Sequence, residues 1–269
     1  MQDKIYISEG LYKDRPHLLK KLKSDFGIVH KYDNDIIGMI LDDKYIDIDK
    51  YSNLKVISRC GIGLDNVNME ECNKRNILIY NIPDIPTIPV ANYTIKLMKD
   101  ILKKVSPQDT LKNRTVGIIG CGRIDTKVIR ILDTLNVKYY YHDLIYNTSL
   151  IDVIRKSNII TIHIPLYNLT RHMIDDKLIS NMNEKTILIN TARGELIDED
   201  SVHNALVDNY ISGFASDVNN ESKFKDVENV IITPHIATFY GNIREELEKI
   251  AIENLLDGLK NKNVETEPF

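Results

Sequence analysis

The sequence predicts an α/β protein with two domains, each built around a parallel sheet. Short apolar runs alternate with amphipathic stretches along the 269 residues, which is the pattern of parallel strands joined by helices. A proline-dense segment, residues 83–89, interrupts this alternation and separates two blocks of it. The second block opens with a strand, a glycine turn and a helix, the order in which nucleotide-binding domains begin.

The first block has the elements of a small flavodoxin-like sheet. Apolar runs predict strands at residues 4–8, 27–32, 36–41, 54–58 and 77–80, and helical periodicity predicts helices at 17–26 and 69–74. Because prolines remove backbone donors, we expect neither a regular helix nor a central strand within residues 83–89. An amphipathic helix is predicted next, at residues 90–104, and we interpret it as the crossing into the second domain.

The second block is longer and has the size of a nucleotide-binding domain. Its strands are predicted to begin at residues 115, 137, 159, 186, 211 and 230, each after a helical segment. A long helix is predicted at residues 242–259, after Tyr240 and Gly241.

The glycine turn predicts a seat for a dinucleotide. Gly120 allows a tight turn, Gly122 lets backbone amides approach a pyrophosphate, and the positive end of the following helix favours that anion. Asp143 lies about 20 residues beyond the turn, where such folds need a carboxylate for the ribose hydroxyls. The alternative is an ordinary strand-to-helix turn, since glycine pairs are common.

Two residues near this turn refine the prediction. Asp125 replaces the third glycine of the fingerprint, and an acid so close to bound phosphates is expected to weaken binding. Leu144 follows Asp143 at a position where an arginine would hold the extra phosphate of NADP, so the sequence favours NAD.

Two later fragments supply residues for oxidising a 2-hydroxy acid. Arg193, in Asn-Thr-Ala-Arg-Gly, has the planar fork that binds a carboxylate and a developing carbonyl. His235, in Thr-Pro-His at a strand end, can take and return a proton near neutral pH. Glu221 is the nearby glutamate that we expect to orient the imidazole. The alternatives are a surface arginine that caps a turn and a structural histidine.

The chain resembles the D-isomer-specific 2-hydroxyacid dehydrogenase family over most of its length. The motifs that carry the resemblance are spread through both blocks, in residues 54–66, 116–124, 163–166, 170–174, 189–194, 215–218 and 233–236. The resemblance implies two Rossmann-like domains: a flavodoxin-like substrate domain, residues 1–86 and 242–269, and a doubly wound NAD-binding domain, residues 87–241. The helix at 242–259 would return the chain to the substrate domain.

The resemblance also implies roles for further residues. Asp217 matches the residue that binds the nicotinamide carboxamide, and Ile62 and Gly63 match a loop whose amides bind the substrate carboxylate. Arg59 precedes that loop, at a position where phosphoglycerate-type relatives bind the substrate phosphate. The remaining positions implied to contact the cofactor are Arg123, Ile124, Ile164, Pro165, Thr170, Thr191 and Ala192.

The composition agrees with such an enzyme. The net charge is −4 and no apolar run reaches the length of a membrane span, so neither nucleic acid nor membrane is an expected partner. Cys60, Cys72 and Cys121 are odd in number and widely spaced, so we expect reduced thiols and no metal site. The N-terminal residues have no signal-peptide pattern, and we expect a cytoplasmic homodimer.

The sequence therefore predicts an NAD-dependent oxidoreductase that interconverts a small D-2-hydroxy acid and its 2-keto acid. 3-Phosphoglycerate and the glyoxylate or hydroxypyruvate pair are the expected substrates. The alternative from another class is a non-catalytic NAD(H)-binding regulatory or scaffold protein with the same fold, which Asp125 and the uncertain placement of Glu221 favour.

Overall fold

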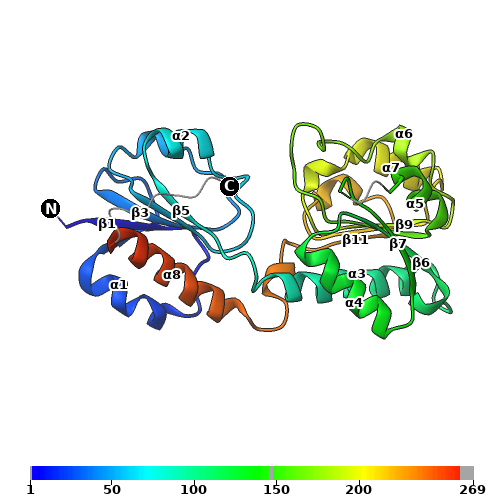
Figure 1. Ribbon diagram of the computed structural model, residues 1–269, viewed down its shortest axis with the longest axis horizontal. Coiled ribbons are helices and arrows are strands. Elements are labelled where there is room, and N and C mark those ends of the chain that lie inside the picture. Colours follow the sequence, from blue (N-terminus) through cyan, green and yellow to red (C-terminus); the bar gives the residue numbers. More distant parts are fainter. Residues whose placement is uncertain (1, 146–147, 261–269) are drawn as a thin grey trace. The chain divides into compact units, whose positions relative to one another are not determined.

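A computed structural model describes residues 2–145 and 148–260 of the chain, which form two compact units. Unit 1 comprises residues 1–86 and 242–269, and unit 2 comprises residues 87–241. The chain therefore passes between the units twice. Figure 1 shows that each unit has helices on both faces of a sheet.

Unit 1 is a five-stranded parallel sheet with the order β2-β1-β3-β4-β5. This is the flavodoxin-like order that we expected, with helices α1 and α8 on one face and α2 on the other (Figure 1). The strands are β1 (Lys4–Ile7), β2 (Gly27–Val29), β3 (Ile36–Leu41), β4 (Val56–Arg59) and β5 (Leu78–Tyr80). The helices are η1 (Pro16–Leu19), α1 (Lys20–Asp25), η2 (Ile48–Lys50), α2 (Met69–Lys74) and α8 (Arg244–Lys260).

Helix α8 packs closely on the sheet of unit 1 because glycines face it. A Cβ atom at Gly38 on β3 would lie 2.8 Å from Cδ1 of Leu255, and one at Gly258 would lie 2.7 Å from Cγ1 of Val56. Because Gly38 and Gly258 have no side chains, helix α8 can approach the sheet closely at both positions. The buried Glu248 of α8 accepts hydrogen bonds from Arg15, Arg244 and the backbone of Tyr12, which fixes the helix against the loop after β1.

Unit 2 is a six-stranded parallel sheet with the order β11-β10-β9-β8-β6-β7. The strands are β6 (Thr115–Ile119), β7 (Lys138–His142), β8 (Ile159–Ile162), β9 (Ile187–Asn190), β10 (Gly213–Ser216) and β11 (Val230–Ile232). The α-helices are α3 (Thr87–Val105), α4 (Arg123–Thr134), α5 (Leu150–Lys156), α6 (Asp176–Ile179) and α7 (Glu199–Val207). The 3-10 turns are η3 (Leu111–Asn113), η4 (Gly194–Leu196), η5 (Glu221–Phe224) and η6 (Ala237–Phe239).

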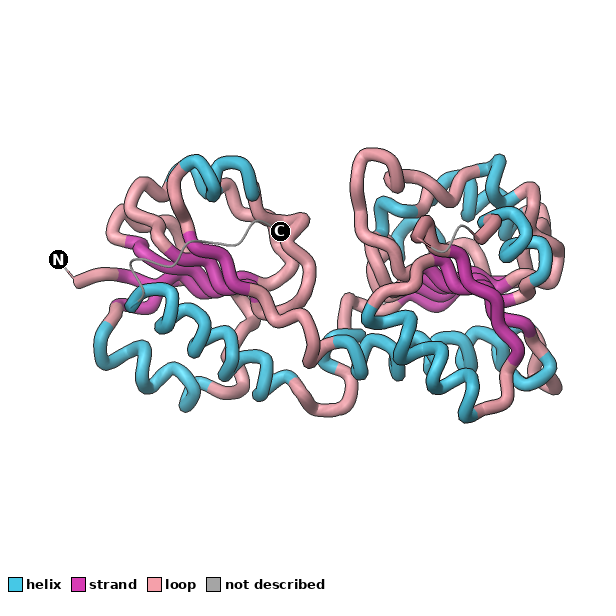
Figure 2. The backbone as a smooth tube through the Cα atoms, in the orientation of Figure 1, coloured by secondary structure: helices cyan, strands magenta, loops and turns pink. Residues whose placement is uncertain are grey.

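The central strands β8 and β9 of unit 2 are apolar and fully buried, because both faces of the sheet are covered (Figure 2). Ile187 and Ile189 of β9 enter the core under α3 and α4, whereas Leu188 enters the core under the helices of the opposite face. The sheet is doubly wound, as we expected, since β7 and β8 lie on opposite sides of β6.

Two expectations about elements were wrong in part. Helix α3 begins at Thr87, so the last three residues of the proline-dense segment are helical. Pro89 lies in the first helical turn, where backbone N–H groups have no intrahelical acceptor and a proline costs little. The segment before β11 is only the four-residue turn η5 and not a helix, because Asn220 caps Ser222 and closes a tight turn.

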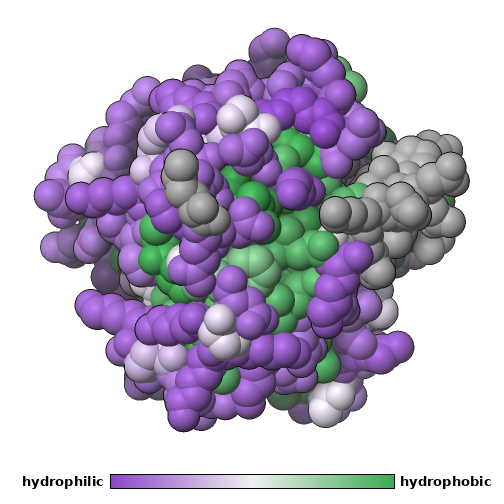
Figure 3. All heavy atoms as spheres, turned by 90° about the vertical axis from the view of Figure 1, so that its left-hand side faces the viewer, coloured by the Kyte–Doolittle hydropathy of each residue, from purple (hydrophilic) through white to green (hydrophobic). Residues whose placement is uncertain are grey.

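Figure 3 shows the side of unit 1 that lies on the left in Figure 1, where hydrophilic residues surround an apolar area. No helix in the described parts of the chain is long and apolar enough to cross a membrane.

Candidate functional site

The candidate site of unit 2 lies at the carboxyl edge of its sheet. All six strands are parallel, so the segments that follow them emerge at one edge. The order of the strands reverses between β6 and β8, and ligands of open α/β sheets bind at such a switch point. The glycine turn follows β6, and the segment that begins at His163 follows β8.

The glycine turn has the backbone that its sequence predicts. Gly120 has a φ of +119°, a conformation that favours glycine, and its N–H donates to the carbonyl of His142 at 2.8 Å. A Cβ atom at Gly120 would lie 3.1 Å from the carbonyl oxygen of His163. Gly122 immediately precedes α4 and is exposed, as is Arg123, the first residue of the helix, while Ile124 packs against the core. The turn therefore presents backbone and a helix N-terminus to a ligand, which fits a pyrophosphate.

Asp143 follows β7 on the other side of the glycine turn. Its N–H donates to the hydroxyl of Thr148, and its Oδ1 accepts the N–H of Ile145 at 2.8 Å. The carboxylate is partly exposed and remains within the loop where a ribose would bind. Leu144 and Ile145 are 89% and 87% exposed, so the described start of this loop, residues 143–145, presents apolar side chains and contains no cationic residue.

The loop after β8 is closed by Thr170. Its hydroxyl donates to the carbonyl of Pro165 at 2.8 Å and accepts the N–H of Tyr167 at 2.8 Å. The Thr170 side chain therefore shapes the loop that carries Ile164 and Pro165, and its expected contact with the cofactor stays a prediction.

Arg193, Asp217 and His235 follow three neighbouring strands, β9, β10 and β11. The register aligns Asn190 with Ser216 and Ser216 with Ile232, the last residues of these strands. Backbone hydrogen bonds continue past the strand ends, from Asp217 N–H to Asn190 O and from Thr233 N–H to Ser216 O. The fold thus brings the predicted arginine, aspartate and histidine segments side by side.

Asp217 holds the segment that contains His235. The carboxylate is buried and accepts hydrogen bonds from the Thr233 hydroxyl at 2.5 Å, the N–H of Ile236 at 3.0 Å and the N–H of Ala237 at 2.7 Å. His235 lies between these donors with a φ of +54°, which is uncommon for a residue with a side chain. We find here a positioning role for Asp217 that the sequence did not predict.

Buried amides shape the loop that carries Arg193. The side-chain amide of Asn190 donates to the Arg193 carbonyl at 2.8 Å and to Oδ1 of Asn219 at 2.9 Å, and its oxygen accepts the N–H of Ala192. The Thr191 hydroxyl is 2.9 Å from that of Thr94 on α3, and both residues are buried. Asn190 and Asn219 were missed by the sequence analysis, although an asparagine that ends an apolar strand is a usable signal.

Glu221 is the first residue of η5, and it is exposed. Asn220 caps this turn, because its side chain accepts the N–H of Ser222. The expected pairing of Glu221 with His235 stays a prediction.

The predicted substrate loop belongs to unit 1. The Arg59 side chain is 5% exposed, donates to the carbonyls of Cys60 and Gly63, and forms an ion pair with Asp43. A Cβ atom at Gly61 would lie 2.7 Å from a guanidinium nitrogen of Arg59, so the loop closes over this side chain. Ile62 and Gly63 are partly exposed at the turn of the loop. Arg59 supports the loop from beneath through these contacts, and the substrate contact expected of its guanidinium stays a prediction.

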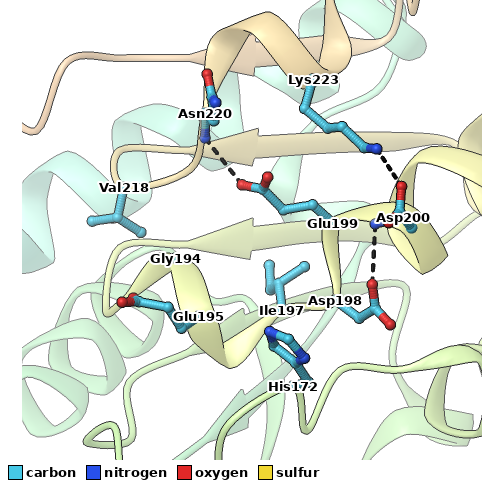
Figure 4. Close-up of a pocket in the computed structure, with 10 residues that line it drawn as sticks. All are labelled: His172, Gly194, Glu195, Ile197, Asp198, Glu199, Asp200, Val218, Asn220 and Lys223. Atoms are coloured by element: carbon cyan, nitrogen blue, oxygen red, sulfur yellow. Dashed lines mark hydrogen bonds and ion pairs between the residues drawn. The ribbon is translucent and has the colours of Figure 1, made fainter.

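A cavity of about 510 Å³ in unit 2 is lined by ten residues of η4, the start of α7 and the segments beside them, and none of the predicted site residues is among them (Figure 4). Its lining carries four carboxylates, those of Glu195, Asp198, Glu199 and Asp200, against a single lysine. Lys223 pairs with Asp200, and Glu199 accepts the N–H of Asn220 (Figure 4). This acidic lining disfavours the phosphates of a dinucleotide. No group of three or more His, Cys, Asp or Glu side chains in the described residues could hold a metal ion.

Comparisons with known proteins agree with this geometry. Residues 90–237 match the family model of the D-isomer specific 2-hydroxyacid dehydrogenase NAD binding domain. A glyoxylate reductase of Thermofilum pendens is 30% identical over 271 residues, with 86% of this chain and 80% of that protein covered. A D-3-phosphoglycerate dehydrogenase of Methanocaldococcus jannaschii is also 30% identical, and this chain spans 56% of its length.

Solved structures share the two-domain architecture. A 3-phosphoglycerate dehydrogenase of Entamoeba histolytica with bound NAD+ superposes with a TM-score of 0.84 at 22% identity, covering 98% of each chain. A D-lactate dehydrogenase of Aquifex aeolicus, in complex with NAD and lactic acid, has a TM-score of 0.81 at 25% identity and covers 96% of this chain and 98% of its own.

The reported relatives are all named as reductases or dehydrogenases, and none supports the non-catalytic alternative. The strand ends, the glycine turn and the matched model lead to one conclusion: the chain belongs to the D-isomer specific 2-hydroxyacid dehydrogenase family of oxidoreductases.

Proposed function

We propose that this protein is an NAD-dependent reductase that interconverts a small, unphosphorylated 2-keto acid and its D-2-hydroxy acid, with residues 87–241 as the NAD-binding domain. The observation that carries the proposal is the alignment of Arg193, Asp217 and His235 at the ends of β9, β10 and β11, on the same sheet edge as the glycine turn. Glyoxylate and hydroxypyruvate are the proposed substrates.

In the proposed mechanism, Arg193 binds the substrate and His235 transfers a proton to it or from it. The Arg193 fork binds the substrate carboxylate and the carbonyl oxygen, where negative charge develops during reduction. His235 donates a proton to that oxygen in reduction and accepts it in oxidation. A nicotinamide cofactor, when bound, would supply or take the hydride. Asp217 keeps His235 at one position through its three hydrogen bonds, and we assign it this part in place of Glu221.

The cofactor is proposed to be NAD rather than NADP. Gly120, Gly122 and the start of α4 would hold the pyrophosphate, and Asp143 would bind the ribose hydroxyls. The phosphate of NADP would meet the negative charge of Asp143 next to the exposed apolar Leu144, with no cation in that loop between Asp143 and Ile145. Ile164 and Pro165, held by Thr170, would flank the adenosine.

The preference for an unphosphorylated substrate follows from Arg59. Its guanidinium is committed to Asp43 and to two loop carbonyls, so a phosphate would have to replace these partners. Ile62 and Gly63 keep the proposed task of binding the substrate carboxylate through backbone N–H groups. Arg59 then acts as a positioning residue for their loop.

The assembly and location belong to the same proposal. We propose a cytoplasmic homodimer, in line with the family and with three free cysteines of which Cys60 and Cys72 are buried. Size-exclusion chromatography with light-scattering detection measures the mass of the protein in solution. A mass near the 31.0 kDa of one chain would contradict the dimer.

The test is NADH and NADPH oxidation with glyoxylate, hydroxypyruvate, pyruvate and phosphohydroxypyruvate, with cofactor binding followed by fluorescence. We expect turnover with NADH on glyoxylate or hydroxypyruvate, and a kcat/KM for phosphohydroxypyruvate at least about tenfold lower. Tight NADH binding without turnover on any acid would overturn the enzyme, and a preference for phosphohydroxypyruvate would overturn the part assigned to Arg59.

A further inference from the structure

Asp125 occupies the inside of the turn in which the pyrophosphate is proposed to bind. It is the third residue of α4, and its side chain is 1% exposed. Its Oδ2 accepts the N–H of Gly122 at 2.5 Å. A Cβ atom at Gly120 would lie 3.2 Å from the same oxygen, so the carboxylate fills the concave side of the turn. The carboxylate therefore already accepts the N–H of Gly122, a backbone donor in the turn where the pyrophosphate is proposed to bind.

The second oxygen of this carboxylate faces a buried histidine. Oδ1 of Asp125 lies 3.8 Å from Nδ1 of His163, whose side chain is also 1% exposed. Neither atom has a hydrogen-bond partner in the structure, whereas Nε2 of His163 lies 2.9 Å from the hydroxyl of Thr161. Unpartnered polar atoms are rare in protein interiors, because each loses its hydration without compensation. Oδ1 of Asp125 and Nδ1 of His163 are close enough that one proton between them would lower the desolvation penalty of both atoms.

The charges around this pair set the sign of its effect on a ligand. His163 follows β8, Asp143 begins the loop after β7, and the Cys121 thiol lies within the turn. Burial raises the pKa of Asp125, while the charge of His163 and the Gly122 N–H oppose that rise. Burial also lowers the pKa of His163. The pair therefore gains a proton as the pH falls, and its net negative charge then disappears.

We propose that Asp125 is an internal competitor of the cofactor pyrophosphate, and that dinucleotide binding is coupled to uptake of a proton by the Asp125 and His163 pair. The inference rests on the proposed NAD site. In the ionised pair, the carboxylate retains the Gly122 N–H and repels the phosphates. In the protonated pair, the repulsion is removed and the Gly122 N–H is released to the ligand. Cofactor affinity consequently rises as the pH falls, which makes the site sensitive to acidification.

The test compares NADH binding by the wild-type protein, Asp125→Gly, Asp125→Asn and His163→Gln between pH 6 and pH 8.5. Asp133→Asn is the matched control, since it removes the same charge from an exposed position of the same helix. Fluorescence titration gives the Kd, and calorimetry in buffers of different ionisation enthalpy gives the number of protons taken up. Thermal unfolding of each variant shows that it is folded. Asp125→Asn preserves an acceptor for the Gly122 N–H if the glycine variant is unstable.

We expect the wild-type Kd to decrease about tenfold from pH 8 to pH 6, with net proton uptake on binding. At pH 8, Asp125→Gly and Asp125→Asn should bind about tenfold more tightly than the wild type. Both variants should lose the pH dependence and the proton uptake. His163→Gln should retain weak binding and lose the uptake, and Asp133→Asn should behave as the wild type does.

Two failures are distinguishable. The inference is overturned if neither Asp125 variant binds NADH more tightly than the wild type, or if the wild type binds NADH without proton uptake. Either result leaves the proposed function intact. Absence of binding to NADH and NADPH in all five folded proteins overturns the proposed cofactor site and the inference together.

Discussion

At the residue scale, the site depends on backbone placement as much as on side-chain chemistry. His235 has left-handed backbone geometry, and its neighbours donate three hydrogen bonds to one buried carboxylate. Residues with such backbones persist where the surrounding structure fixes them, and they are common at functional sites. Asp217 provides that constraint.

The first prediction concerns the proton that His235 transfers. His235→Gln should lower kcat by at least about 100-fold, because glutamine cannot donate or accept a proton, while the Kd of NADH stays nearly unchanged. Stopped-flow turnover and fluorescence titration give the two quantities. His172→Gln is the control, since His172 also has a positive φ, of 52°, but lies outside the proposed machinery. A near wild-type kcat in His235→Gln would remove His235 from the mechanism.

The second prediction concerns Asp217. Asp217→Asn keeps the shape of the side chain but replaces one acceptor oxygen by an amide donor, which faces the N–H of Ala237 or of Ile236. We expect a destabilisation of about 1–3 kcal/mol by chemical denaturation and a fall in kcat larger than the rise in KM. Unchanged kcat together with normal stability would show that His235 does not need this carboxylate.

The sequence predicted the location of site residues correctly where their position along the chain determines it. It placed Arg193, Asp217 and His235 at strand ends, and parallel topology alone brings these together. It did not reveal where side chains form hydrogen bonds. Thr170 bonds within its own loop, Arg59 lies beneath its loop, and Glu221 is an exposed residue at the start of η5.

At the scale of elements, α8 is the clearest case of a helix held by both shape and charge. Burial raises the pKa of Glu248, but hydrogen bonds from Arg15, the Tyr12 backbone and Arg244 outweigh it, so the pKa of this carboxyl lies below its ordinary value of 4.5. The ionised form therefore stabilises the folded state.

The third prediction follows from the sign of this shift. Because the folded-state pKa of Glu248 is depressed, its contribution is present above pH 4.5 and is lost as the pH falls through the folded-state value. Glu248→Gln should lower the free energy of unfolding at pH 7, and should flatten its decrease below pH 4.5 relative to the wild type. Urea denaturation across this range measures both. Glu246→Gln, an exposed change on the same helix, should leave the profile unaltered.

Element boundaries were less predictable than the elements themselves. Apolar periodicity identified all eleven strands, because buried parallel strands are continuous apolar runs. The start of α3 was missed because a proline-dense stretch and a first helical turn have the same local sequence, and only packing distinguishes them.

At the scale of the whole molecule, the two units have separate cores. Buried residues of unit 1 centre on β3 and β4, and those of unit 2 form one cluster on each face of its sheet. Each unit therefore has its own local stability, which a ligand bound to that unit can change.

The fourth prediction is that NADH protects unit 2 selectively. Hydrogen exchange followed by mass spectrometry should show slower exchange in residues 115–125, 139–145 and 187–193, where the cofactor is proposed to bind, and little change in strands β1 and β2 of unit 1. Equal protection of both units would contradict a cofactor site confined to unit 2. Asp125→Asn should strengthen the protection at pH 8.

The division of unit 1 between the two ends of the chain has a consequence for its synthesis. The strands β1 to β5 leave the ribosome first, but the helix that fits over Gly38 emerges only after all of unit 2 has been translated. Until then the apolar face of β3 beneath α8 has no cover from its own chain. The nascent protein therefore exposes this apolar sheet face while unit 2 is being translated, and exposed apolar surface of this kind is prone to aggregation.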